Sequence, residues 1–252
     1  MELDRIYNMD CLEGMKSMPD DSVDYSITSP PYNFCLQLHC GRYTHRSSGV
    51  QRAGLKVNKY TNGLSDSLPM EDYYQWQCDC IDQMLRLTKD IVFYNIQIVT
   101  GNKSAVLRIL GKYADNIKEV LIWDKCNGEP AIQGGVLNSE YELILALSKN
   151  DCKGRQFYNA QFERGTMSNV IRINKNHENQ HRAAFPMMLP RTLISKFTPP
   201  QSVILDPFIG SGTTAVACIK EKRHYVGFEL DPNYYKLAVK RIKEFSMQLT
   251  LF

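Results

Sequence analysis

The 252-residue sequence contains no apolar run long enough to cross a membrane. Its first ten residues, MELDRIYNMD, are acidic and mixed, which is unlike a signal peptide. With 43% hydrophobic and 23% charged residues, the composition is that of a soluble globular chain with one large core. We therefore expect a cytoplasmic protein, encoded by a bacterium, an archaeon or a phage, that has no membrane partner.

No two cysteines have the two-residue spacing of a zinc-binding loop. The sequence has eight cysteines, and the closest pair, Cys78 and Cys80, is separated by one residue. In a cytosolic context such cysteines are expected to be free thiols that pack as small apolar side chains. The sequence therefore predicts no metal site.

Dinucleotide and P-loop signatures are also missing, although a glycine-rich turn is present in VILDPFIGSGTT (203–214). An apolar strand ends there at Asp206, and a helix is expected to begin at Thr213, where free N–H groups and glycines allow a ligand to approach closely. A second strand, HYVGFEL, ends at Glu229, whose carboxylate could accept hydrogen bonds from both ribose hydroxyls or could cap the next helix. The two features together indicate an adenosine-type ligand without pyrophosphate, for which S-adenosylmethionine (SAM) is the leading candidate.

Apolar patterns along the chain predict strands alternating with helices. Strands are expected at 22–28, 90–99, 117–125, 139–149, 202–208 and 224–230. Helices are expected at 71–88, 102–113, 185–198, 212–222 and 232–245. This alternation favours an α/β fold with a mainly parallel sheet covered on both faces.

The stretch TSPPYN (28–33) places two prolines at the end of the first expected strand. Proline fixes φ and donates no hydrogen bond, so the strand cannot continue through the pair. Taken alone, the stretch fits either a rigid turn or a catalytic elbow.

Together with DPFIGSGTT and GFELDPNYYKLAVKR, TSPPYN resembles the β-group of DNA amino-methyltransferases, which methylate cytosine N4 or adenine N6. The resemblance extends over nearly the whole chain, through VFYNIQ, LIWDK and NSEYELILALSK. It implies a single methyltransferase domain over 1–252, with a mostly parallel, doubly wound sheet and one antiparallel strand. It also implies a circularly permuted order, in which the catalytic motif precedes the SAM motif.

The resemblance assigns roles to individual residues. It implies that SAM is bound by Asp10, Cys11, Phe185, Asp206, Phe208, Gly210, Ser211, Gly212, Thr213 and Glu229. It implies that the catalytic elbow is Ser29, Pro30, Pro31 and Tyr32. The lone pair of an exocyclic base nitrogen is delocalised into the ring, so acceptors for its hydrogens, Ser29 Oγ and the Pro30 carbonyl, would make it more nucleophilic. Tyr32 would stack on a base rotated out of the helix.

Two irregular insertions, at about 34–66 and 150–182, are candidate DNA-contacting segments. The chain has no acidic residue from Ser26 to Ser65, and this stretch is either a solvated loop or an arm that contacts phosphates. Its basic residues include Arg42, Arg46, Arg52, Lys56 and Lys59. The second insertion contains Arg172 and Lys175, among other Arg, Asn and Gln residues of the kind that read bases.

The expected partner is double-stranded DNA, while a homodimer and a cognate restriction endonuclease are further candidates. Serine at the first position of the elbow leans to cytosine N4 in this family, and adenine N6 is the alternative. Two other classes stay open: a DNA-binding protein without turnover, and an RNA or protein methyltransferase. In enzymes of the latter class the elbow usually follows the SAM loop, whereas here it precedes it.

Overall fold

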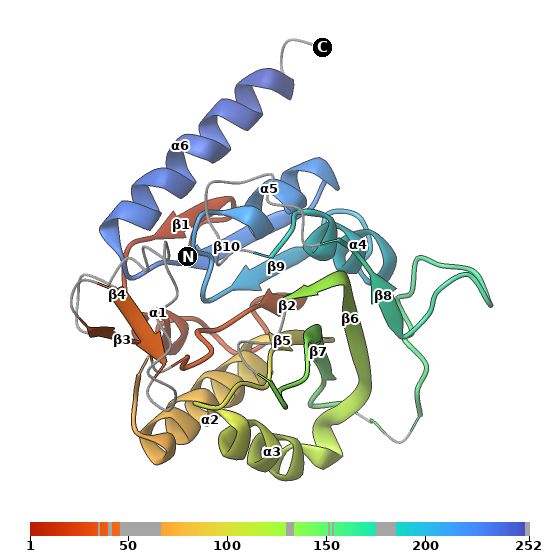
Figure 1. Ribbon diagram of the computed structural model, residues 1–252. Helices are drawn as coiled ribbons and strands as arrows, with labels where there is room; N and C mark the ends of the chain where they lie inside the picture. The colour runs from red at the N-terminus through yellow and green to blue at the C-terminus, as the bar shows by residue number, and fades with distance from the viewer. Residues whose placement is uncertain are drawn as a thin grey trace.

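The computed structural model describes residues 1–34, 67–129, 134–150, 152, 154–174 and 185–249, together with the backbone of two short strands at 36–39 and 42–45 (Figure 1). An eight-stranded sheet forms the centre. Its strands, in order across the sheet, are β1 (Arg5–Tyr7), β10 (His224–Phe228), β9 (Val203–Asp206), β2 (Tyr25–Thr28), β5 (Val92–Ile96), β7 (Ser139–Leu147), β6 (Ile117–Glu129) and β8 (Val170–Arg172).

All neighbouring strands of this sheet pair in parallel except those that involve β7, which runs antiparallel to both β5 and β6. The predicted α/β fold with a mostly parallel sheet and one antiparallel strand is therefore confirmed. Because β2, β5, β9 and β10 run the same way, their carboxyl ends meet at one edge of the sheet. The residues that follow these four strands include the two motifs that the sequence singled out.

Helices cover both faces of the sheet, as Figure 1 shows. The α-helices are α1 (Cys11–Lys16), α2 (Met70–Leu87), α3 (Lys103–Lys112), α4 (Met188–Phe197), α5 (Thr213–Lys220) and α6 (Pro232–Leu249), and a 3₁₀ turn, η1, spans Ala114–Asn116. One buried cluster contains residues of α1, α2 and α3, and a second contains residues of α4, α5 and α6. Within β5, Phe93 belongs to the second cluster while Val92 and Tyr94 belong to the first. Burial on both faces explains why the strand reads as one unbroken apolar run.

Three elements of the main sheet and its cover are absent from the sequence-based prediction: β1, α1 and β8. Each is short, and β1 buries only Ile6 among its three residues. The antiparallel ribbon β3 (Leu36–His39) and β4 (Arg42–His45) lies within the stretch predicted as irregular. A three-residue strand has too few apolar positions to show a period, so whether the segment forms a strand depends on its pairing with a neighbouring strand.

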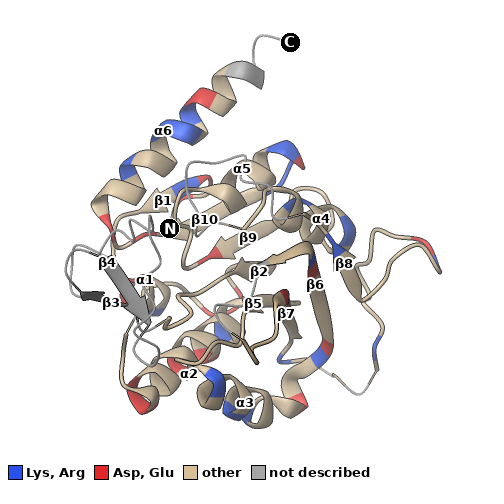
Figure 2. Ribbon diagram, viewed as in Figure 1, with Lys and Arg blue, Asp and Glu red and all other residues tan. Residues whose placement is uncertain are grey.

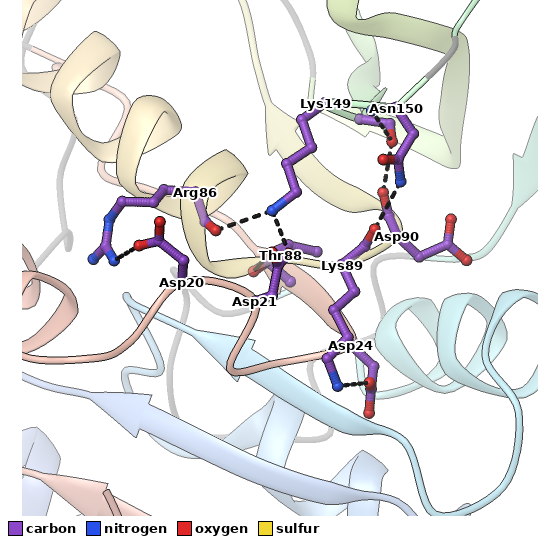
Figure 3. A network of polar contacts seen from close by, with 11 residues as sticks. Asp20, Asp21, Asp24, Arg86, Thr88, Lys89, Asp90, Lys149 and Asn150 are labelled. Carbon is purple, nitrogen blue, oxygen red and sulfur yellow. Dashed lines mark hydrogen bonds and ion pairs between the residues drawn. The ribbon is translucent and has the colours of Figure 1, made fainter.

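A polar network closes the edge of the sheet where β2 and β5 begin (Figure 3). Arg86, in the last turn of α2, donates to the Asp20 carboxylate at 2.5 Å. Lys149, just after β7, donates to the Arg86 carbonyl at 3.1 Å and pairs with Asp21. Exposed ion pairs of this kind each contribute only about 0–1 kcal/mol. The network therefore connects the segment before β2, the last turn of α2 and the end of β7, at the edge of the sheet opposite the two motifs.

Among the residues that the structure describes, no helix is both long and apolar enough to span a membrane. Within the same ranges, His, Cys, Asp and Glu form no group of three or more that could hold a metal ion. Four of the cysteines, Cys11, Cys78, Cys80 and Cys218, are buried free thiols.

Candidate active site

Strands β2 and β9 lie side by side and bring the proline elbow and the glycine turn to one edge of the sheet. Thr28, the last residue of β2, donates its hydroxyl to the Asp206 carboxylate, the last residue of β9, at 2.7 Å. Both side chains are buried, at 1% and 2% exposure. The two motifs that the sequence identified, one near each end of the chain, therefore touch.

The Asp206 carboxylate also holds the glycine turn itself. Its Oδ1 accepts the Phe208 backbone N–H at 3.0 Å, and its Oδ2 accepts the Thr214 hydroxyl at 2.5 Å. Burial raises the pKa of Asp206 to about 6, although these three hydrogen bonds oppose the rise. Asp206 therefore stabilises the turn, whose residues are predicted to contact the ligand.

The turn between β9 and α5 is compact and uses glycine where other residues would be strained. Gly210 has φ of +54° and Gly212 has φ of +81°. A Cβ atom on Gly212 would lie 3.2 Å from the Ala238 side chain of α6, so α6 packs directly against the turn. Arg241 of α6 donates to the Ser211 carbonyl at 3.2 Å and to the Thr213 hydroxyl at 3.0 Å. This support from α6 was not predicted from the sequence.

Glu229 follows β10 and is 7% exposed. Its Oε1 accepts the Asp231 backbone N–H at 2.7 Å. Burial raises the pKa of Glu229 to about 7, while N–H groups of Asp231 and Gly210 hold it down. The carboxyl group therefore lies beside the glycine turn, where an acid that holds a ribose is expected.

The loop after β1 adjoins Glu229, because Asn8 donates to the Glu229 carbonyl at 2.7 Å. Asp10 caps α1 by accepting the N–H groups of Leu12 at 2.9 Å and Glu13 at 3.2 Å. Cys11, 6% exposed, packs beneath this loop in the core. The structure thus brings these two predicted residues to the Glu229 side of the site and gives Asp10 a helix-capping role as well.

Two predicted aromatic residues are placed by packing. Phe208 lies against Trp76 of α2, with ring centroids 5.5 Å apart in an edge-on arrangement. Phe185 is partly buried and packs on the cluster that contains α4 and α5.

The proline elbow is fixed from α2 and from the loop after β5. Tyr73 and Gln77 donate to the Pro31 carbonyl at 2.9 and 3.3 Å, so this carbonyl is occupied. Asn33 has φ of +57°, and its amide donates to Gly101 O at 2.9 Å and accepts Leu68 N–H at 2.7 Å. Pro30 is itself buried, and its carbonyl meets no such donor within the described residues.

Ser29 and Tyr32 lie in a compact polar cluster. Ser29 Oγ and the Tyr32 hydroxyl are 2.7 Å apart, and Tyr32 donates to Glu142 Oε2 at 2.6 Å. The Asn95 amide donates to Tyr32 and to Glu142, both at 2.7 Å, and lies 3.3 Å from Ser29 Oγ. Burial, with the Glu142 carboxylate, raises the pKa of Tyr32 well above its usual value, so the hydroxyl stays protonated.

Asn95 and Glu142 were not identified from the sequence. Asn95 interrupts the apolar strand β5, and Glu142 is the buried polar residue directly before the apolar part of β7; both lie close to the site edge. A polar residue inside a strand that is apolar on both faces is the signal that could have indicated them. Asn95 Oδ1 is buried and meets no donor in the described part of the chain, which is typical of functional sites.

Of the predicted DNA contacts, only Arg172 has a described side chain; Arg42, Arg46, Arg52, Lys56, Lys59 and Lys175 lie outside the described side chains. Arg172 is 69% exposed and pairs with Asp124 at 3.4 Å. Figure 2 shows the described Lys and Arg residues spread over several elements, α3 and α6 among them, with acidic residues between them.

Comparisons with known proteins bear on the family and the fold. A family model described as DNA methylase matches residues 23–240. The chain is 24% identical to the type II methyltransferase M.BglII of Bacillus subtilis over 94% of this chain and 68% of that protein. The solved structure of the cytosine-N4-specific PvuII DNA methyltransferase superposes with a TM-score of 0.65, at 17% identity, over 95% of this chain and 90% of that one. TTHA0409 of Thermus thermophilus, solved with S-adenosyl-L-methionine, gives a TM-score of 0.63 at 22% identity, over 96% and 93% of the two chains.

Proposed function

The chain belongs to the DNA methylase family, and from that membership and the site we propose that it transfers a methyl group from SAM to the N4 amino group of cytosine in DNA. The observation that carries the choice of reaction is the position of Ser29. Ser29 is partly exposed and precedes Pro30, whose carbonyl accepts no hydrogen bond from the described part of the chain, on a stiff elbow next to the glycine turn.

The residues around the glycine turn fit SAM. A fully charged pyrophosphate would lie poorly beside the buried carboxyl groups of Glu229 and Asp206, whereas an uncharged ribose suits Glu229. At Gly210 an added Cβ would have only the Phe208 carbonyl within 4 Å, so no side chain crowds the backbone of the turn there. Asp10, Cys11, Phe185 and Phe208 are proposed to complete the walls of this site.

When bound, SAM supplies a methyl group activated by a positively charged sulfur. Ser29 Oγ and the Pro30 carbonyl would accept the two hydrogens of the target amino group, which turns the nitrogen lone pair out of conjugation with the base. As the methyl–sulfur bond breaks and the neutral thioether leaves, the nitrogen would form the new bond to carbon and would lose one proton to water. Alignment of the reacting groups can contribute roughly 7–11 kcal/mol to lowering the barrier.

The Tyr32 ring is proposed to stack on the rotated base. Tyr32 is partly exposed, and its ring lies against that of Phe34, with the centroids 5.8 Å apart. Cytosine N4 is favoured over adenine N6 by Ser29 at the head of the elbow and by the fold shared with the cytosine-N4-specific PvuII enzyme. Phosphate contacts are proposed for the acid-free stretch within about 34–66, and base contacts for 150–182, including Arg172.

Nucleoside analysis tests the proposal directly. The purified chain is incubated with methyl-labelled SAM and duplex DNA of mixed sequence, and the DNA is then digested to nucleosides. Labelled N4-methylcytosine is expected, and its rate of formation should fall about 100- to 1,000-fold with Ser29→Ala but not with Ser104→Ala, an exposed serine of α3. Labelled N6-methyladenine would overturn the choice of base, and the lack of any labelled nucleoside would overturn the function.

A further inference from the structure

A buried ion pair lies behind the elbow. Lys125 Nζ on β6 is 3.0 Å from Glu142 Oε1 on the neighbouring strand β7, and the two side chains are only 1% and 5% exposed. Gln97 also accepts a hydrogen bond from Lys125 at 3.2 Å. Buried pairs of this kind are often no more stabilising than apolar residues of the same size, so stability alone gives little reason for one here.

The second oxygen of the same carboxylate leads to the elbow. Glu142 Oε2 accepts the Tyr32 hydroxyl at 2.6 Å, and that hydroxyl is 2.7 Å from Ser29 Oγ. A continuous path of contacts therefore runs from Lys125 through Glu142 and Tyr32 to Ser29. It joins β6 and β7 to the end of β2, across β5.

Counting donors along this path fixes the direction of each hydrogen bond. A carboxylate only accepts, so the single Tyr32 proton is given to Glu142. The Tyr32 oxygen can then only accept from Ser29, and it also accepts from the Asn95 amide at 2.7 Å. The Ser29 proton is thereby directed into the protein. Of the two lone pairs of Ser29 Oγ, one can face the Asn95 amide at 3.3 Å, which leaves the other for an incoming donor.

We propose that Glu142, held by Lys125, is a positioning residue that makes Ser29 a hydrogen-bond acceptor for the amino group of the target base. The inference rests on the proposed function, because it concerns the same amino group. It also gives the Tyr32 hydroxyl a task that stacking by the ring does not require. The strand residues Glu142 and Lys125 act through Tyr32 and do not touch the base.

Tyr32→Phe separates the two tasks of this side chain, since it keeps the ring and removes only the hydroxyl. Ser29 then loses its internal acceptor, and its proton is free to point toward the base. We expect kcat to fall about 10- to 100-fold, the range for loss of a hydrogen bond in a charged network. The KM for DNA and the Kd for SAM should stay within about twofold, because a loss confined to the transition state lowers kcat alone.

Glu142→Gln tests the far end of the path. An amide can donate to the Tyr32 oxygen, which would turn the Tyr32 proton toward Ser29 and reverse the polarity of the path. We expect kcat to fall by a similar factor, and the double variant with Tyr32→Phe to be no slower than about the slower single variant. Glu140→Gln is the matched control, because Glu140 lies on the same strand and is exposed.

Melting curves and SAM titration show whether each variant is folded, and Tyr32→Phe alone still tests the inference should Glu142→Gln unfold. A wild-type kcat in Tyr32→Phe would overturn it. So would losses that multiply in the double variant, which indicate two independent effects. Absence of DNA methylation by the wild-type chain would instead defeat the proposed function, so the two failures are distinguishable.

Discussion

The Thr28 hydroxyl and the Asp206 carboxylate form a buried hydrogen bond of 2.7 Å between residues 178 positions apart in the chain. Thr28 directly precedes Ser29 of the elbow, and Asp206 opens the glycine turn. One contact thus sets the distance between the residues proposed to hold the base and those proposed to hold the cofactor. A shift here would move both groups relative to one another.

Replacing Thr28 with Val should weaken this connection. Asp206 would lose one of its three donors while remaining buried, so we expect a loss of about 1–3 kcal/mol in the free energy of unfolding, measured by urea titration. Thr28→Ser retains the hydroxyl and should recover most of that loss. Equal stability of Thr28→Val and the wild type would show that the hydrogen bond is of no consequence.

Ser29→Ala should lower turnover far more than it lowers SAM affinity. The hydroxyl lies in the elbow and is not among the residues proposed to bind SAM, and its proposed bond to the base is strongest as the nitrogen reacts. Removal of such a group commonly costs about 100- to 1,000-fold in kcat. Steady-state kinetics and SAM titration measure the two effects separately; a variant with weakened SAM binding and normal kcat at saturating SAM would contradict the assignment.

Gly210→Val should weaken SAM binding. Gly210 has φ of +54°, which a β-branched residue adopts only with strain, and the new side chain would project where the backbone is proposed to approach the ligand. Gly111→Ala is a suitable control, because nothing lies within 4 Å of its new Cβ on α3. Calorimetric titration that gives the wild-type Kd for Gly210→Val would place the ligand elsewhere.

SAM affinity should depend on pH through Glu229. The pKa of Glu229 is raised to about 7, and the ionised carboxylate is the better acceptor for ribose hydroxyls. We therefore expect the Kd for SAM to fall as the pH rises from about 6 to about 8. Glu229→Gln should bind SAM more weakly and without this pH dependence, whereas a Kd that is constant over this range in the wild type would argue against Glu229 as the ribose ligand.

The free energy of unfolding of the ligand-free protein should decrease as the pH rises, whereas the affinity for SAM should increase. A carboxyl group whose folded pKa lies above its unfolded value binds its proton more tightly when folded. The resulting stabilisation is fully present below the unfolded pKa of about 4.3 and is lost as the pH rises through about 7 for Glu229. Urea titrations at several pH values should show that the free energy of unfolding decreases less with rising pH in Glu229→Gln than in the wild type.

The acid-free stretch should act on DNA affinity without reading sequence. If Arg52 and Lys56 neutralise phosphates, replacing both with Ala should flatten the slope of log K against log salt by roughly two units. Lys220 and Lys222 provide a control with the same change in charge, because both are exposed and lie at the edge of the sheet opposite the elbow and the glycine turn. A changed base preference in the Arg52 and Lys56 variant would show that the stretch reads bases.

The sequence by itself determined the alternation of strands and helices, the glycine turn and the proline elbow, because each depends on residues close together in the chain. A short apolar run such as VILD, bounded by turn residues, is typical of a buried strand, and glycine permits the φ of +81° that Gly212 adopts in the turn. The same local motifs were sufficient to indicate the family.

Only the tertiary structure decided what surrounds Ser29. Lys125 and Glu142 read in the sequence as charges on strand segments, and such residues are usually exposed. They are buried because β6 and β7 pair in a register that sets Glu142 opposite Trp123, two residues before Lys125, and this places the ion pair beside Asn95 of β5 and behind Tyr32. Glu142 lies 110 positions from Tyr32 in the chain, so the contact depends on how the sheet is ordered and not on any local pattern.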